Sequence, residues 1–165
     1  MPDSPSSRWA PHVTVAAVIE QDGRYLLVEE HTAEGLRCNN PAGHLEPGES
    51  LVQACAREVL EETCHAFRPE ALVGIYLARL GSPAEAITYL RFAFCGTLGP
   101  QEVGRMPDTG IVRSVWMTAS EVFANSAAMR SPLVAASIRD HARGQRYSLD
   151  VLHTAASALW TDRAL

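Results

Sequence analysis

Residues 43–65 read GHLEPGESLVQACAREVLEETCH, and this stretch decides the fold. Pro47 and Gly48 interrupt regular structure, and Ser50 stands at a position where helix N-caps are favoured. The chain then continues to Cys64 without a Gly or Pro, so we predict a helix from Ser50 to about Cys64. The helix residues expected to pack into the core are Val52, Ala56 and Val59.

Three carboxylates lie close together on the predicted helix: Glu58, Glu61 and Glu62. Residues three and four apart are helix neighbours, so the three side chains fall within a sector of roughly 100°. Like charges at these spacings repel, and the dipole at a helix C-terminus disfavours anions. A hard cation such as Mg²⁺, which prefers oxygen ligands and bridges carboxylates to substrate phosphates, would turn the repulsion into binding. The alternative is an exposed acidic face without a ligand.

The segment resembles the signature of the Nudix hydrolase family, which runs Gly, any five, Glu, any seven, Arg-Glu, a hydrophobic, any one, Glu-Glu, any one, Gly, a hydrophobic. The residues that match at the required spacing are Gly43, Glu49, Arg57, Glu58, Val59, Glu61 and Glu62. With roughly 6% usage at each of the six Gly or charged positions, a chance match is on the order of 10⁻⁵. Cys64 and His65 depart from the signature, at positions that concern the helix end more than the metal site.

The resemblance implies a phosphoanhydride hydrolase with Mg²⁺, or alternatively Mn²⁺, as its cofactor. The implied metal ligands are Glu58 and Glu62, with Glu61 and the backbone carbonyl of Gly43 as further ligands. Glu61 is alternatively the group that takes a proton from the attacking water. The resemblance also implies that Arg57 pairs with Glu49 and orients the acids, whereas a plain surface ion pair is the alternative for these two residues.

Many family members add an acid from a loop, often about six residues before a Trp in a late strand. In this chain that position, before Trp116, is Gly110. Asp108 lies nearby and Glu102 is in the same predicted loop. We therefore take Asp108 as the first candidate for an extra acid, with a solvated loop acid as the alternative.

Matches outside the signature extend the resemblance to a subfamily of bacterial Nudix phosphatases, over most of residues 11–150. They are the segments 11–16, 28–30, 41–46, 130–134 and 144–147. That subfamily removes terminal orthophosphate from nucleoside di- and triphosphates, and it acts on the diphosphates of thiamine and of its hydroxymethylpyrimidine precursor. Most Nudix relatives instead cut inside the phosphate chain, releasing pyrophosphate or acting on nucleotide sugars and ADP-ribose, and this is the alternative activity.

One departure concerns substrate recognition. Cys38 stands where a large aromatic residue often precedes the Pro-Ala-Gly segment, so a base would lack its usual stacking partner. Tyr76, Tyr89 and Arg91 lie on predicted pocket-side strands and are candidates to replace it, although strand packing is the more ordinary role for such residues. Arg130 is a candidate phosphate contact, with a surface position as its alternative.

The remaining sequence predicts an α+β protein: a single Nudix-type α/β/α sandwich with a mixed sheet between helices. Strands are expected at 13–19, 25–28, 71–80, 87–98 and 111–117, with loops at 31–38 and 99–110. Asp22-Gly23 predicts a hairpin turn, Thr118 to Glu121 a capping box, and Ser131-Pro132 the start of a helix that ends at Arg143, before Gly144. The expected domain is 11–155, between a flexible tail at 1–10 and a C-terminal tail at 156–165.

Composition narrows the class further. The chain has 165 residues, 47% of them hydrophobic and 20% charged, with a net charge of -5. This balance is typical of a globular protein and gives no electrostatic reason to bind nucleic acid or an anionic membrane. No signal peptide and no apolar run of about 18 residues is present, so we expect a cytoplasmic monomer or homodimer that acts on a small molecule. The cysteines, expected to be reduced packing residues, are Cys38, Cys55, Cys64 and Cys95.

Three other interpretations remain at this point. A zinc deaminase would explain His44-Leu45-Glu46, but that class also needs a Pro-Cys-x-x-Cys tetrad, which the sequence lacks. A non-catalytic, nucleotide-sensing Nudix module usually loses signature carboxylates, and here all are present. A cysteine nucleophile, Cys38 or Cys55, has no local sequence support for activation.

Overall fold

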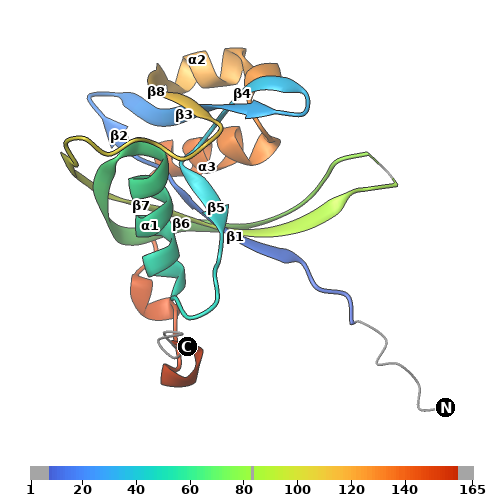
Figure 1. Ribbon diagram of the computed structural model, residues 1–165, viewed down its shortest axis with the longest axis vertical. Coiled ribbons are helices and arrows are strands. Elements are labelled where there is room, and N and C mark those ends of the chain that lie inside the picture. The colour runs from blue at the N-terminus through green and yellow to red at the C-terminus, as the bar shows by residue number, and fades with distance from the viewer. Residues whose placement is uncertain (1–7, 83, 160–165) are drawn as a thin grey trace.

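The computed structural model describes residues 8–82 and 84–159 (Figure 1). Residues 1–7 of the predicted N-terminal tail and residues 160–165 of the predicted C-terminal tail lie outside the described residues, as does Pro83 between two predicted strands. Within the described part of the chain, no helix has the length and apolar character needed to cross a bilayer.

The first sheet combines strands from both halves of the chain, in the order β5-β1-β7-β6. β1 runs parallel to β7, whereas the β1–β5 and β6–β7 pairs are antiparallel. Its members are β1 (His12–Ala17), β5 (Ala42–His44), β6 (His65–Leu80) and β7 (Ile87–Gln101). The long β6–β7 hairpin extends beyond the helices, at the right of Figure 1.

The second sheet is antiparallel and is built around β3, which pairs with β2, β4 and β8. Its members are β2 (Glu20–Gln21), β3 (Arg24–Thr32), β4 (Gly35–Asn39) and β8 (Ile111–Thr118). Asp22 and Gly23 both have positive φ, which confirms the predicted Asp-Gly hairpin turn between β2 and β3. The α+β class is confirmed, but the strands form two sheets where one mixed sheet was expected.

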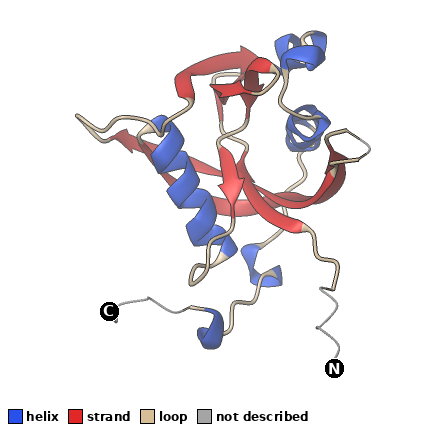
Figure 2. Ribbon diagram, turned by 45° about the vertical axis from the view of Figure 1, so that its right-hand side comes forward, coloured by secondary structure: helices blue, strands red, loops and turns tan. Residues whose placement is uncertain are grey.

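Helices cover the strands on two faces (Figure 2). They are α1 (Leu51–Thr63), α2 (Ala119–Ala124) and α3 (Pro132–Ala142), with short 3₁₀ turns η1 (Ser126–Ala128), η2 (Leu149–Val151) and η3 (Ala156–Ala158). Successive strand residues point to opposite faces, so Phe94 and Leu72 pack with α1 while Cys95 and Val73 pack with α2 and α3. The described residues therefore form two hydrophobic cores, one on each side of the strands.

Local sequence explains where α1 begins and ends. Ser50 caps it by accepting a hydrogen bond from the backbone N–H of Gln53, while the Gln53 side chain accepts one from the Ser50 N–H. The helix ends at Thr63 although Cys64 replaces the usual Gly, because Cys64 adopts the left-handed conformation with φ 61°. The buried face includes Val59, as predicted, but is centred on Cys55 rather than Ala56.

The predicted loop at 31–38 is wrong. β3 continues to Thr32, and β4 returns along it from Gly35. The strand β5 was also missed, because three residues are too few for a recognisable alternation. The other strands lie where they were predicted, but two of them are longer. β6 begins at His65 rather than near Ala71, and β7 extends through Gln101. The capping box at Thr118 and the Ser131 N-cap are present as predicted.

Candidate active site

The acidic face of α1 packs directly against β5. A side chain at Gly43 would overlap the Glu58 carboxylate, which occupies the space where a Cβ would lie. One turn further along, the Glu62 carboxylate accepts a hydrogen bond from the backbone N–H of Ala42 at 2.9 Å. Two signature carboxylates are thus held against the backbone of one short strand, and only glycine at position 43 allows the approach.

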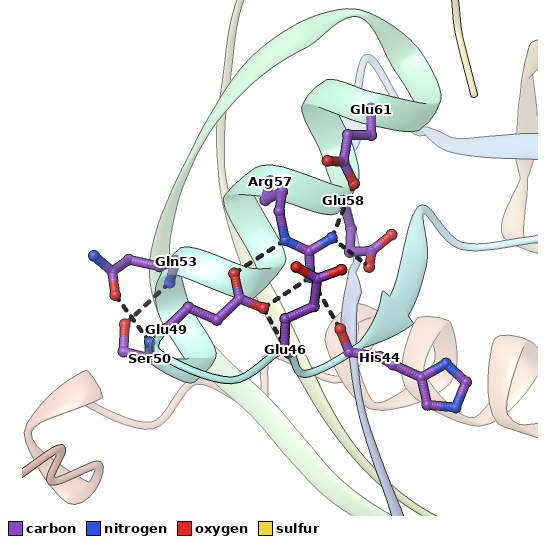
Figure 3. A network of polar contacts seen from close by, with 8 residues as sticks. All are labelled: His44, Glu46, Glu49, Ser50, Gln53, Arg57, Glu58 and Glu61. Carbon is purple, nitrogen blue, oxygen red and sulfur yellow. Dashed lines mark hydrogen bonds and ion pairs between the residues drawn. The ribbon is translucent and has the colours of Figure 1, made fainter. Parts of the chain in front are cut away.

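Arg57 joins the acids into one network (Figure 3). Its Nε and Nη2 donate to the two carboxylate oxygens of Glu49, at 3.0 and 2.8 Å. Its Nη1 donates to Glu58 at 2.8 Å and to Glu61 at 2.9 Å, and Nη2 also reaches the carbonyl oxygen of His44 at 2.9 Å. The pairing of Arg57 with Glu49 that the resemblance implied is therefore present, and the same guanidinium also holds two of the acids.

Burial and the repulsion between neighbouring charges make Glu58 and Glu62 costly to ionise. Burial, together with the nearby charges of Glu58, Glu30 and Asp108, raises the pKa of Glu62 to about 8. Burial also raises the pKa of Glu58, against the opposing effect of Arg57. For Glu49, burial pushes the pKa upward, but the hydrogen bonds from Arg57 and from the Glu46 backbone outweigh it and lower the pKa. A cation beside Glu58 and Glu62 would offset this cost.

The donor set fits a hard divalent cation in its chemistry: carboxylate oxygens from three glutamates, two of which lie against the backbone of β5. Within residues 8–82 and 84–159, no three His, Cys, Asp or Glu side chains already form a group that could hold a metal ion. Arg57 bonds to Glu58 and Glu61 instead. Binding a cation would therefore require these two carboxylates to exchange the guanidinium for the metal.

The loop after β7 places one of the two candidate loop acids near the network. The backbone N–H of Asp108 donates to the carbonyl of Glu61 at 2.9 Å, and the charge of Asp108 raises the pKa of both Glu58 and Glu62. Glu102 instead pairs with Arg105 at 3.1 Å. Asp108 is thus the better placed of the two, and its role in catalysis stays a prediction.

A pocket of about 410 Å³ opens beside Ala42 and Gly43, where the two sheets meet. Its walls include three of the four predicted substrate-binding residues: Tyr89, Arg91 and Arg130. Other lining residues, which sequence reasoning missed, include Thr14, Glu30, Asn39 and His44. They come from four different strands, β1, β3, β4 and β5, so no local pattern could have revealed them as a group.

Arg91 is the most unusual residue of the pocket. It is only 8% exposed, and its Nε and Nη1 have no hydrogen-bond partner among the described residues. Burial lowers its pKa to about 10, although the nearby charges of Glu30 and Glu62 act in the opposite direction. A buried guanidinium with unused donors is a strong candidate ligand for an anion or another acceptor group.

Tyr89 contributes an aromatic wall. Its ring contacts His12 and His44, with ring centroids 5.8 and 6.2 Å apart. Arg130 pairs with Glu30, its Nη1 lying 3.1 Å from Oε2. Tyr89 thus supplies an aromatic side chain at the pocket wall, and Arg130 is held at that wall by its ion pair with Glu30.

Tyr76 corrects one sequence expectation. It pairs with Arg91 across the β6–β7 ladder, but its hydroxyl donates to Asp140 of α3 at 2.9 Å. It lines a different cavity, together with Leu72, Ile75 and Tyr147. Tyr76 shares a face of the strands with Arg91, but it contacts α3 and lines the other cavity.

The cysteines are free and buried, all four lying in the described part of the chain. Burial raises the pKa of both Cys38 and Cys55, so neither thiol is activated as a nucleophile. Their expected role as packing residues is confirmed, and the cysteine-nucleophile alternative loses its support.

Comparisons with a family model, a curated protein and solved structures all point to the same family. The model of the NUDIX domain family matches residues 10–136. The phosphatase NudJ of Escherichia coli strain K12 is 39% identical over 144 residues, which are 86% of this chain and 90% of NudJ. A solved NUDIX hydrolase from Nitrosomonas europaea is 52% identical with a TM-score of 0.82, and the match covers 88% of this chain and 98% of that one. The MutT protein from Methanosarcina mazei Go1, 20% identical with a TM-score of 0.68 over 84% of this chain and 99% of that one, shares the fold.

Proposed function

This chain belongs to the Nudix hydrolase family, and from that premise we propose that it is a magnesium-dependent phosphatase. It releases orthophosphate from nucleoside di- and triphosphates or from thiamine-related diphosphates. The observation that carries the proposal is the packing of the Glu58 and Glu62 carboxylates against Gly43 and Ala42, at the edge of a pocket of about 410 Å³.

The metal would be held by Glu58 and Glu62, with Glu61 and the Gly43 carbonyl as further ligands. When bound, magnesium would offset the charge that develops on the phosphates and help make a water nucleophilic. Glu61, if it is not a ligand, accepts the proton of that water. The raised pKa of Glu58 and Glu62 supports this arrangement, because anions that are costly to bury alone gain most from a cation.

The arginines and Glu49 position the carboxylates and offset negative charge. Arg57 fixes Glu49 with two hydrogen bonds, and before a cation binds it also holds the carboxylates of Glu58 and Glu61. The Glu49–Arg57 pair is partly shielded from solvent and therefore acts as a rigid support. Arg91 and Arg130, at the pocket wall, add positive charge along the path of an anionic substrate.

The release of orthophosphate, rather than pyrophosphate, is supported by the similarity to NudJ, which is named a phosphatase and aligns with 86% of this chain. The second candidate is a Nudix pyrophosphohydrolase that cuts inside the phosphate chain or acts on ADP-ribose or a nucleotide sugar. A non-catalytic binding module is less well supported, because every signature carboxylate is present and the acids are joined in one network.

The product assay separates these candidates. The purified chain is incubated with Mg²⁺ and a panel of nucleoside di- and triphosphates, thiamine diphosphate, its pyrimidine precursor diphosphate, ADP-ribose and diadenosine polyphosphates. Orthophosphate is measured with and without added pyrophosphatase, and parallel reactions contain EDTA. Orthophosphate without pyrophosphatase, and none with EDTA, is the expected result. A signal that requires pyrophosphatase would contradict the phosphatase proposal, and binding without any turnover would favour a binding module.

A further inference from the structure

Four side chains around the substrate pocket carry buried polar atoms without a partner. Within the described residues, Thr14 Oγ1, Glu30 Oε1, Asn39 Oδ1 and both Nε and Nη1 of Arg91 have no hydrogen bond. All four residues line the same pocket. Because buried polar groups are nearly always hydrogen-bonded in folded proteins, several unused groups facing one cavity indicate a ligand that satisfies them.

The four residues meet because of the strand register. Thr14 of β1 and Arg91 of β7 are partners across the parallel ladder. Glu30 and Asn39 come from the second sheet, on the adjacent strands β3 and β4. The four side chains thus come together where the two sheets meet, and we call them the pocket floor.

The mixture of donors and acceptors restricts the ligand. Arg91 can only donate, whereas a carboxylate that pairs with an arginine, as that of Glu30 does with Arg130, serves as an acceptor. The second Glu30 oxygen, Oε2, is already engaged by Arg130 at 3.1 Å, and the Glu30 side chain is only 17% exposed. A phosphate group, which carries acceptors, would satisfy Arg91 but would face the Glu30 carboxylate oxygen. The floor therefore suits a group that presents a donor beside an acceptor.

We propose that the side chains of the pocket floor recognise the heterocycle of the substrate by hydrogen bonds. They select rings in which an exocyclic amino group adjoins a ring nitrogen that accepts a hydrogen bond. Glu30 Oε1 accepts a hydrogen bond from the amino group, and Arg91 donates to the ring nitrogen. The Tyr89 ring, at the pocket wall beside His44, provides a face on which a planar ring stacks. Cytosine and adenine have this edge, whereas in uracil and hypoxanthine the amino group is replaced by a carbonyl and the ring nitrogen by an N–H donor.

This inference rests on the proposed function, because both place the substrate in this pocket, and it is tested by binding alone. Calorimetry measures the Kd of two isosteric pairs, cytidine against uridine monophosphate and adenosine against inosine monophosphate, in the presence of Mg²⁺. These monophosphates contain no phosphoanhydride bond, so turnover does not affect the result. We expect the amino-bearing member of at least one pair to bind ten times more tightly or better.

Glu30→Gln tests the role of the carboxylate. An amide presents both a donor and an acceptor, so the preference should fall to within about threefold. Glu29→Gln is the matched control: Glu29 is the preceding residue of β3, where it pairs with Arg113, and this variant should keep the preference. Thermal unfolding of both variants checks that the fold is intact.

The inference is overturned if neither pair shows a preference in the unaltered chain, if no monophosphate binds, or if Glu30→Gln retains the full preference. A preference without any phosphoanhydride hydrolysis would contradict the proposed function and leave the inference standing. Hydrolysis without a preference between the monophosphates would support the proposed function and contradict this inference.

Discussion

At the scale of single residues, the close approach of Gly43 to Glu58 fixes β5 against the acidic face of α1. We expect Gly43→Ala to lower kcat/KM by about 100-fold, because a Cβ would push the Glu58 carboxylate from its place and small displacements in a site of this kind are costly. The free energy of unfolding should change only slightly, because the Glu58 side chain can turn toward solvent. Steady-state kinetics and urea unfolding measure the two effects, and an unaltered rate in a folded variant would contradict the role of this contact.

The loop acid makes a second prediction at this scale. The charge of Asp108 acts on Glu58 and Glu62, so Asp108→Asn should weaken the attraction for a cation and lower kcat/KM by about tenfold. Glu102→Gln removes a carboxylate of the same loop that pairs with Arg105, and its rate should stay within about twofold. Equal losses in both variants would show that the loop acts through its net charge alone.

At the scale of elements, the start of α1 positions the whole acidic face. Ser50→Ala removes the side chain that accepts from the Gln53 N–H, and it should lower the free energy of unfolding by about 1 kcal/mol. Urea unfolding measures the loss. Ser148→Ala, which removes a cap from the short turn η2, should cost less, and a reversed order would argue against α1 as a strongly capped element.

The same helix shows what local sequence can predict. Its limits follow from Ser50 and from the absence of Gly and Pro, and its acids follow from fixed spacing, so this part of the site was predictable. The pocket floor was not, because Thr14, Glu30 and Arg91 converge through the pairing of strands from different parts of the chain. The residues of β4, 35–39, also lack a clear alternation, so pairing with β3 rather than local preference makes them a strand.

At the scale of the whole molecule, a half-buried histidine lies between the second sheet and α3. His141 of α3 lies against the hydroxyl of Tyr25 at 3.0 Å, and its other ring nitrogen contacts Arg146. Burial and the Arg146 charge lower the pKa of His141 to about 4, against a nearby opposing charge at Glu20. The folded chain therefore keeps this imidazole neutral over a range in which the unfolded chain protonates it.

The consequence is a stability that depends on pH. The unfolded chain takes up the proton near pH 6.5 and the folded chain only near pH 4, so the unfolded state binds more protons between these values. The free energy of unfolding should fall as the pH is lowered through this window and should be unaffected by this group above it. Urea unfolding at pH 7.5 and pH 5 measures the change, and His141→Gln should show a smaller difference between the two values. An equal difference would assign the effect to other groups.

The central claim for the molecule is that the acidic face of α1 is a metal-dependent catalytic centre. The most direct measurement is the rate of Mg²⁺-dependent phosphoanhydride hydrolysis by Glu62→Gln beside Glu70→Gln, which alters an exposed glutamate of β6 paired with Arg68. We predict that Glu62→Gln loses about 1,000-fold or more in kcat while remaining folded, and that Glu70→Gln keeps the full rate. Equal rates in the two variants would contradict the claim.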